Sequence, residues 1–419
     1  MNEKEYKERE KVYACWLCNF PDMGSGKRHK LSELCGGPEG IYFAGKEKWA
    51  QVLSEKQVKS LSEYTASWKP EAEYRNMKER GIWLLNSWDR DYPKCLAEMP
   101  DKPYGLFVKG KLPGEGVPTV AIIGARDCSE YGGFVARELG AFLGRNGIPV
   151  ISGMARGIDG IAQEAAMNEG GKSVAILGSG VDVCYPPRNR KIYERLVQGG
   201  AVISEYPLGT GALAMNFPVR NRIVSGLADA VVVVEARVKS GTLITVDMAL
   251  EQGREVYVVP GRITDRLSDG CNRLVKQGAA LMLSPEEFLE ELWELWERKK
   301  ERQNGIKEAA SEGKDTDAIA KGQTEQVIRI SAKSIKEKGK RNATEHIIEM
   351  KEASVLATLS PERAAIYKAL DETPKTVEDI LKALPPKYQN LQITTHLMWL
   401  CMQNRAIQVT PGHFCRKKE

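Results

Sequence analysis

The segment from residue 104 to residue 283 alternates short, uninterrupted apolar runs with stretches that repeat apolar residues at helical spacing. Such apolar runs are typical of strands buried on both faces, and helices between them indicate a parallel, doubly wound sheet. We expect strands at residues 119–123, 149–151, 173–177, 201–204, 229–235, 255–259 and 280–283. We expect helices at residues 131–146, 160–169, 189–198, 241–252 and 270–277. The predicted fold class is therefore α/β.

Glycines and cations gather where these strands end. Gly124, Gly153, Gly178 and Gly180 follow expected strands, and Gly241 opens an expected helix. The carboxyl ends of parallel strands form the ligand crevice of an open sheet. Five separate loops also bring cations to this edge, namely Arg126, Arg156, Arg190, Lys191, Arg220, Arg222 and Lys239. A lone arginine is usually solvated, but cations from five loops favour an anionic ligand.

The stretch from residue 216 to residue 226 has the features of a phosphate site. Pro218 suits a first helical turn, where its missing N–H is not needed, and the following backbone donors are then free for an anion. Arg220, Asn221 and Arg222 are expected where a loop becomes a helix. Two guanidiniums beside open helix amides predict a phosphate-binding corner. Phe217 is a base-stacking candidate and, equally, a core candidate.

The spacing of the glycines and the positions of the histidines bear on whether this edge of the sheet is an enzyme site. Gly124 is followed by Ala125 and Arg126 rather than by a Gly-x-Gly-x-x-Gly pattern, so a nicotinamide dinucleotide is not expected. All four histidines lie outside residues 104–283, which leaves a carboxylate, Cys, Lys or Tyr as the acid–base group. We favour Glu205 and Glu235 as partners of neighbouring arginines or as loop caps. We therefore expect binding without catalysis and without a cofactor.

Chain length indicates the number of domains, and net charge indicates what kind of surface the protein has. A chain of 419 residues predicts about two to four domains. Its net charge is only +5, with 61 basic and 56 acidic residues, so any anion site must come from local clustering. The charged N-terminus precedes no apolar signal core, and no uncharged run is long enough for a bilayer, so we expect a cytoplasmic protein without membrane contact. Nine scattered cysteines predict reduced thiols.

Four segments are expected along the chain. Residues 1–84 read as a small helical domain, in which the pattern around Pro21 and Gly24 looks like a degenerate helix-hairpin-helix, a SAM-like arrangement. Residues 85–299 form the α/β core. Residues 300–352 contain no aromatic residue and are rich in Lys, Glu, Gly, Ser and Thr, which predicts a flexible linker.

Residues 353–419 are expected to form a small winged helix. Ser360 and Pro361 are a helix cap and a first-turn proline, and Thr376 caps a second helix. The expected helices cover residues 361–370, 377–384 and 391–404, and the expected strands cover residues 406–409 and 413–416. Whether this domain meets duplex DNA or a protein stays open.

Cys15, Cys18, His29 and Cys35 have spacings that a zinc site can use. Cys15 and Cys18, however, lie on a predicted helix and flank Trp16 and Leu17, where ordinary packing accounts for them. We favour packing over metal.

Several motifs together resemble the DprA/Smf family of DNA-processing proteins, over about residues 85–292. They are residues 122–126 (Ile-Ile-Gly-Ala-Arg), 152–159 (Ser-Gly-Met-Ala-Arg-Gly-Ile-Asp), 185–186 with Asn189, 204–207, 217–223 (Phe-Pro-Val-Arg-Asn-Arg-Ile), 239–245 and 259–261. The resemblance implies an extended Rossmann domain that binds single-stranded DNA in a basic pocket and forms a homodimer. It further implies protection of incoming DNA and loading of the RecA recombinase during natural transformation.

Family positions carry over to this sequence residue by residue. Arg126 matches the arginine of the family's Gly-Ser-Arg motif, although Ala125 stands where the family usually has Ser or Thr. Arg190 and Lys191 fall where a basic residue follows the Tyr-Pro and Asn positions. The full set of expected DNA-binding residues is Gly124, Arg126, Ser152, Gly153, Arg156, Gly178, Gly180, Arg190, Lys191, Phe217, Arg220, Asn221, Arg222, Lys239, Ser240 and Gly241.

An enzyme of the same fold group is the alternative. The lysine-decarboxylase-like phosphoribohydrolases also use glycine loops and an arginine in a nucleotide pocket. Their Pro-Gly-Gly-x-Gly-Thr-x-x-Glu signature is not found, and residues 239–245 stand in its place without the glutamate. Glu205 and Glu235 are the carboxylates that this alternative would need.

Overall fold

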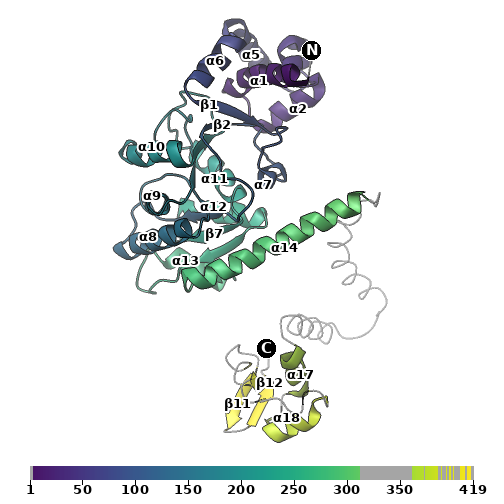
Figure 1. Cartoon of the computed structure of the whole chain (residues 1–419), viewed down its shortest axis with the longest axis vertical. Helices are drawn as coiled ribbons and strands as arrows, with labels where there is room; N and C mark the ends of the chain where they lie inside the picture. Colours follow the sequence, from purple (N-terminus) through teal and green to yellow (C-terminus); the bar gives the residue numbers. More distant parts are fainter. Residues whose placement is uncertain are drawn as a thin grey trace. The chain divides into compact units, whose positions relative to one another are not determined.

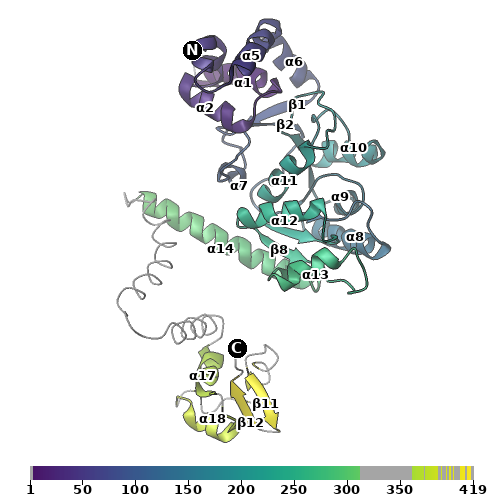
Figure 2. The ribbon, with the colours of Figure 1, turned by 180° about the vertical axis from the view of Figure 1, so that it is seen from behind.

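The computed structural model describes residues 3–311, 361–371, 373–385 and, in the last part of the chain, residues 388, 393, 396, 397, 400, 406–410 and 413–416. The chain forms two compact units, Met1–Gly305 and Ile306–Glu419, and each has its own apolar core. Figures 1 and 2 show them from opposite sides. No helix in the described ranges is both long enough and apolar enough to cross a membrane.

The first unit begins with helices, as predicted for this region. They are α1 (Glu3–Asn19), α2 (Ser25–Cys35), α3 (Pro38–Ala44), α4 (Lys46–Trp49), α5 (Glu55–Ser67) and α6 (Pro70–Glu79). Ser54 and Gln57 form a capping box at α5, and Pro70 starts α6 where no N–H is required. Trp16 and Leu61 are fully buried, so this region has a packed interior.

A nine-stranded sheet follows. Its strands are β1 (Ile82–Asn86), β2 (Gly105–Gly110), β3 (Val120–Ile123), β4 (Val150–Ser152), β5 (Ser173–Ile176), β6 (Ala201–Ser204), β7 (Ala230–Val233), β8 (Glu255–Val258) and β9 (Ala280–Leu281). Their order is β1-β2-β6-β5-β4-β3-β7-β8-β9. Strands β3 to β9 are mutually parallel, which confirms the α/β prediction.

Two strands were not predicted. β2 pairs antiparallel with β6, and β1 pairs antiparallel with β2. They extend the sheet on the side of the N-terminal helices, and Leu84 and Phe107 join the same core as Trp16. The sheet therefore continues through β1 into the segment that precedes the predicted α/β pattern, whereas β2 lies at the start of that pattern.

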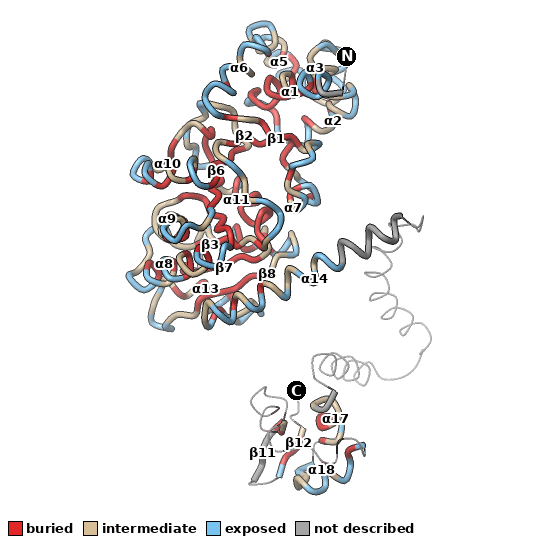
Figure 3. The backbone as a smooth tube through the Cα atoms, in the orientation of Figure 1, coloured by how far each residue is buried: buried red, intermediate tan, exposed pale blue. Residues whose placement is uncertain are grey.

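Both faces of the sheet are covered by helices. These are α7 (Lys94–Ala97), α8 (Glu130–Arg145), α9 (Ile158–Asn168), η1 (Pro187–Asn189), α10 (Arg190–Gly199), α11 (Asn216–Gly226), α12 (Gly241–Glu251), α13 (Asp269–Lys276) and α14 (Pro285–Ser311). Val120 and Ile122 pack with α8, α9 and α14, whereas Ala121 and Ile123 pack with α11, α12 and α13. Figures 1 and 2 show these two helical layers, and the strands between them are buried over most of their length (Figure 3).

Helices α8 and α9 approach each other through glycines. A Cβ at Gly140 or Gly144 would collide with the carbonyl oxygen of Ala162 or Ala166 in α9. Because both glycines lie on one face of α8, the two backbones meet closely. This packing fixes α9, whose first turn reaches the carboxyl edge of the sheet.

The second unit has a smaller core. It contains α17 (Pro361–Ala369), α18 (Val377–Ala383), β10 (Lys375–Thr376), β11 (Ala406–Thr410) and β12 (His413–Arg416), with the strand order β10-β12-β11. Thr376 and Asp379 form a capping box at α18. Ile366, Ile380 and Phe414 are buried together. Two of the three predicted helices and the predicted hairpin are therefore present.

Two expectations fall partly outside the described residues. Helix α14 continues to Ser311, so residues 300–311, expected in the linker, are helical. The remainder of the expected linker, residues 312–352, lies outside the described residues. The same holds for most of the expected third helix, residues 391–404.

Candidate functional site

A cavity of about 620 Å3 opens at the carboxyl edge of the parallel strands. Loops after β3, β4 and β7 line it together with the first turns of α11 and α12. Nine of the residues assigned to DNA binding from the sequence meet here, namely Gly124, Arg126, Gly153, Phe217, Arg220, Asn221, Lys239, Ser240 and Gly241. Segments that are far apart in the sequence thus contribute to one site.

Glycines allow the loops to come close together. A side chain at Gly124 would meet Ile158 of α9, with its first atom 2.7 Å from Cγ1. A side chain at Gly153 would collide with the guanidinium of Arg220. Both positions therefore need a residue without a Cβ because a neighbouring side chain occupies that space.

Arg220 lies in the second turn of α11 and is 5% exposed. Its Nη1 donates to the carbonyl oxygen of Gly153 at 3.0 Å and also to that of Ile176. Burial lowers the pKa of Arg220 to about 10, while the nearby Asp159 carboxylate opposes that shift. Arg220 thus joins α11 to the ends of β4 and β5 and places a positive charge on the cavity wall. Since α11 begins at Asn216, Arg220 is not at the loop-to-helix junction expected from the sequence.

Phe217 is the centre of a cluster of cations and aromatic rings. Its ring centre lies 5.5 Å from Cζ of Arg126 and 5.8 Å from Cζ of Arg220. The ring of Tyr185 lies 5.6 Å away, and Tyr185 itself is 44% exposed. Gly178 leaves room behind the ring, because a Cβ there would lie 3.0 Å from it. Cation–π contacts of this kind hold flat guanidiniums over a ring face.

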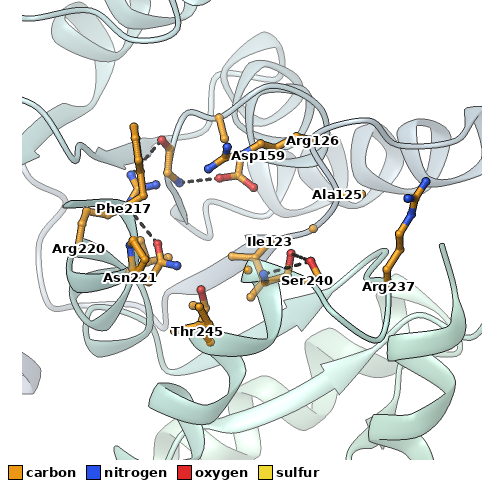
Figure 4. Close-up of a pocket in the computed structure, with 18 of the residues that line it drawn as sticks. Ile123, Ala125, Arg126, Asp159, Phe217, Arg220, Asn221, Arg237, Ser240 and Thr245 are labelled. Atoms are coloured by element: carbon orange, nitrogen blue, oxygen red, sulfur yellow. Dashed lines mark hydrogen bonds between the residues drawn. The ribbon is translucent and has the colours of Figure 1, made fainter. Parts of the chain in front are cut away.

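The other wall comes from the loop after β7 and from α12. Figure 4 shows Phe217, Arg220 and Asn221 on one side of the cavity and Ser240 and Arg237 on the other. The Ser240 hydroxyl accepts a hydrogen bond of 3.2 Å from the backbone N–H of Thr242 and so caps α12. Lys239 precedes this cap and is exposed.

Arg237 and Asp159 line the cavity but were not assigned to the site from the sequence. Arg237 follows the apolar run of β7, so its place after a strand was the available signal. Asp159 is 8% exposed and accepts a hydrogen bond of 3.1 Å from the N–H of Gly153. Burial raises the pKa of Asp159, and Arg220 opposes this shift. This hydrogen bond joins Asp159, at the start of α9, to the loop that follows β4.

Some assigned residues lie near the cavity without lining it. Ser152 is fully buried and its hydroxyl donates to the carbonyl oxygen of Ile122 at 2.7 Å. The N–H of Gly180 donates to the carbonyl oxygen of Thr210 at 2.8 Å. Arg190 and Lys191 are exposed at the start of α10. Arg156 lines a neighbouring hollow.

Arg222 points to a different environment. Its Nε lies 2.9 Å from Asp101, and its Nη2 donates to Glu205 at 2.7 Å. Glu205 also accepts a hydrogen bond from the hydroxyl of Ser25, at the start of α2. Arg222 and Glu205 therefore connect α11 to the N-terminal helices, and Arg222 is not among the cavity residues.

The two glutamates considered for chemistry are both engaged. Glu205 holds Arg222, and Glu235 is fully buried, where it accepts from the backbone N–H of Ser129 at 2.9 Å and from its hydroxyl. This confirms the favoured interpretation, an arginine partner and a loop cap. Neither carboxylate lines the cavity.

The cysteines considered for zinc pack in the helical core. Cys15 and Cys18 are each 1% exposed, and Sγ of Cys15 lies 3.8 Å from Sδ of Met77. Burial raises the pKa of Cys18 to about 11. His29 instead contacts the carbonyl oxygen of Lys102 and the ring of Tyr104. Within the described ranges, no group of three or more His, Cys, Asp or Glu side chains is placed to hold a metal.

Comparisons with known proteins agree with this fold. The sequence model of the DNA recombination-mediator protein A family matches residues 83–293. DNA processing protein DprA of Streptococcus pneumoniae is 42% identical over 203 residues, which are 48% of this chain and 72% of that protein. Protein Smf of Escherichia coli is 46% identical over 202 residues, which are 48% of this chain and 54% of that protein.

A solved structure covers more of the chain. The X-ray structure of Streptococcus pneumoniae DprA aligns with a TM-score of 0.60 and 33% identity, over 67% of this chain and 97% of that one. The family match spans all seven parallel strands and both walls of the cavity. The chain therefore belongs to the DprA/Smf family of DNA recombination-mediator proteins.

Proposed function

We propose that this protein binds single-stranded DNA in the cavity at the carboxyl edge of its sheet. The observation that carries the proposal is a set of cations and rings in one cavity. Arg126 and Arg220 lie over the ring of Phe217, which packs beside Tyr185, and Lys239 lines the opposite wall. Proteins that bind single strands combine cations that follow the phosphates with ring faces on which bases stack. Membership of a family of DNA recombination mediators supports the same substrate.

The form of the cavity favours unpaired nucleotides. Its volume of about 620 Å3 is that of a small-ligand pocket and suits a short stretch of single strand rather than a duplex. Its cations are arginines and a lysine, which bind phosphates without regard to sequence. We therefore expect little sequence preference.

We propose that the site binds without catalysis. Glu205 and Glu235 are held outside the cavity. Of the two carboxylates that line it, Asp159 accepts a hydrogen bond from the N–H of Gly153 and Asp127 forms an ion pair with Arg156. A general base needs a free lone pair within reach of the substrate. The test is incubation with nucleoside monophosphates. Release of free base that Glu205→Gln or Glu235→Gln abolishes would support a phosphoribohydrolase instead.

We further propose the roles that the family resemblance implies. These are an extended Rossmann domain for residues 85–299, a SAM-like helical domain for residues 1–84 and a winged helix for residues 353–419. As a homodimer in the cytoplasm, the protein would protect incoming single strands and load RecA during natural transformation. Removal of residues 353–419, followed by affinity measurements on duplex and single strands and on purified RecA, tests the role of the last domain.

The main experiment is a salt titration of binding to a labelled oligothymidine, followed by fluorescence anisotropy. Arg126→Ala and Lys239→Ala should each weaken binding and reduce the slope of log K against log salt by about 0.7 per lost contact. Arg75→Ala and Lys59→Ala are matched controls, because both residues are exposed on the N-terminal helices, outside the residues that line the cavity. Unchanged affinity and slope in both cavity variants would refute the proposal.

A further inference from the structure

A second hollow lies beside the main cavity on the same edge of the sheet. Its volume is about 420 Å3, and Arg126, Arg156 and Arg188 line it together with the start of α9. The two hollows share Arg126 and Asp127 and so form neighbouring parts of one surface. Glu164 also lines this hollow, so its charge is not wholly positive. Three guanidiniums nevertheless outnumber two carboxylates.

Backbone contacts fix the loops that carry these arginines. Gly157, with φ of 78°, lies against the carbonyl oxygens of Ala125 and Arg126, where no side chain fits. The N–H of Ile158 donates to the carbonyl oxygen of Ala125 at 3.2 Å. The loop of Arg156 is thus bound directly to the loop of Arg126.

The third loop is fixed by Asn189. Its Nδ2 donates to the carbonyl oxygens of Met154 at 3.0 Å and of Ala155 at 3.2 Å. Arg188, the residue before it, is therefore held beside the loop of Arg156. The three arginines thus extend from loops whose backbones are fixed relative to one another.

Asp127 already places an anion in this hollow. Its side chain is 77% exposed, yet its carboxylate forms an ion pair with Nη2 of Arg156, whose side chain is 42% exposed. A carboxylate and a phosphate present similar paired oxygens to a guanidinium. The carboxylate of Asp127 is therefore bound to the guanidinium of Arg156, the group that a phosphate entering the hollow would contact.

We propose that this hollow is a second phosphate subsite for the same single strand, and that Asp127 occupies Arg156 in place of a phosphate until the strand displaces it. The proposal rests on the proposed function, because the strand that fills the main cavity continues across Arg126 into the hollow. Asp127 then weakens binding, and it provides an internal anion that favours release of the strand.

The test uses the full-length protein and a labelled oligothymidine long enough to span both hollows. Asp127→Asn keeps the shape of the side chain and removes its charge. It should tighten binding by about two- to fivefold at low salt, because Arg156 no longer has to give up its ion pair when the phosphate enters. Arg188→Ala should weaken binding and make the slope shallower.

A double variant and a control isolate the role of the ion pair. In the background of Arg156→Ala, Asp127→Asn should bring a clearly smaller gain, because the partner of the carboxylate is gone. Glu251→Gln removes an exposed carboxylate at the far end of α12 and should leave affinity unchanged. Equal affinities for Asp127→Asn and Glu251→Gln, or an undiminished gain without Arg156, would overturn the second subsite. If Lys239→Ala, which alters the main cavity alone, still weakens binding in that case, the main site stands and only the subsite fails.

Discussion

The guanidinium of Arg220 donates a hydrogen bond of 3.0 Å to the carbonyl oxygen of Gly153, although the two residues are 67 positions apart in the chain. This contact joins α11 to the end of β4. It exists because Gly153 has no Cβ, since that atom would occupy the place of the guanidinium. The charge on the cavity wall and the packing of α11 on the sheet therefore depend on the same pair.

Gly153→Ala should damage both stability and binding. The added methyl group must displace a buried arginine, and overpacking of this kind costs about 1–3 kcal/mol. Displaced Arg220 can no longer support the ring of Phe217, so affinity for an oligothymidine should fall as well. Urea unfolding and anisotropy measure the two effects.

The control for this variant is Gly116→Ala. A Cβ at Gly116 would meet nothing within 4 Å, and the residue lies outside the cavity. It should change neither the free energy of unfolding nor the affinity. If Gly153→Ala is as stable as this control, the proposed dependence of Arg220 on Gly153 is wrong.

Arg222→Ala is expected to behave differently from Arg126→Ala. Side chains of Arg222 and Glu205 are each 11% exposed, so loss of the arginine leaves a largely buried carboxylate with fewer partners. We expect a loss of about 1–3 kcal/mol in the free energy of unfolding, somewhat below that of a fully buried pair. The salt slope of DNA binding should stay that of the unaltered protein, because Arg222 lies outside the cavity.

Arg126→Ala provides the comparison, since it should reduce the salt slope with little change in stability. Arg126 is exposed and lines both hollows. A smaller slope in Arg222→Ala, with unchanged stability, would instead place Arg222 on the DNA, as expected from the sequence.

Tyr185→Leu tests the aromatic part of the site separately from its charge. Loss of a base stack costs about 1–3 kcal/mol of binding free energy and removes no phosphate contact. Affinity should therefore fall while the salt slope remains constant. Phe134→Leu is the control, because Phe134 is 58% exposed on α8 and does not line the cavity. Equal affinities of the two variants would remove Tyr185 from the site.

The sequence allowed the parallel sheet to be predicted because its strands are apolar on both faces. The runs around Val120 and Val231 have no polar interruption, and both of their faces are indeed covered by helices. β1 and β2 also contain apolar runs, in Ile-Trp-Leu-Leu-Asn and Gly-Leu-Phe-Val-Lys-Gly, but they lie beside an irregular segment rather than in the alternation of strands and helices. β1 pairs with β2, and β2 pairs with β6, both antiparallel.

The sequence predicted which residues lie at the edge of the sheet better than it predicted the directions of their side chains. Strand ends and glycines placed Gly124, Arg126 and Lys239 at one edge, where the structure has them. Helical periodicity puts Arg220 and Arg222 on different sides of α11, but it does not determine which of them faces the cavity. Arg222 meets Asp101 and Glu205, which come from distant segments. Only the packed fold brings these carboxylates to it.

His29 should make the stability of the protein sensitive to mild acid. It contacts the carbonyl oxygen of Lys102 at 3.3 Å and the ring of Tyr104, and burial lowers its pKa below the ordinary 6.5. The unfolded chain therefore takes up a proton at His29 at a higher pH than the folded chain does. The contribution of neutral His29 to the free energy of unfolding should be complete above about pH 6.5. It should decrease as the pH falls from there through the lowered pKa of the folded protein. Thermal melts of the protein and of His29→Gln between neutral and mildly acidic pH measure this, since glutamine keeps a donor but does not titrate in that range. The decrease should be smaller in the variant, and equal decreases would show that other groups cause the acid sensitivity.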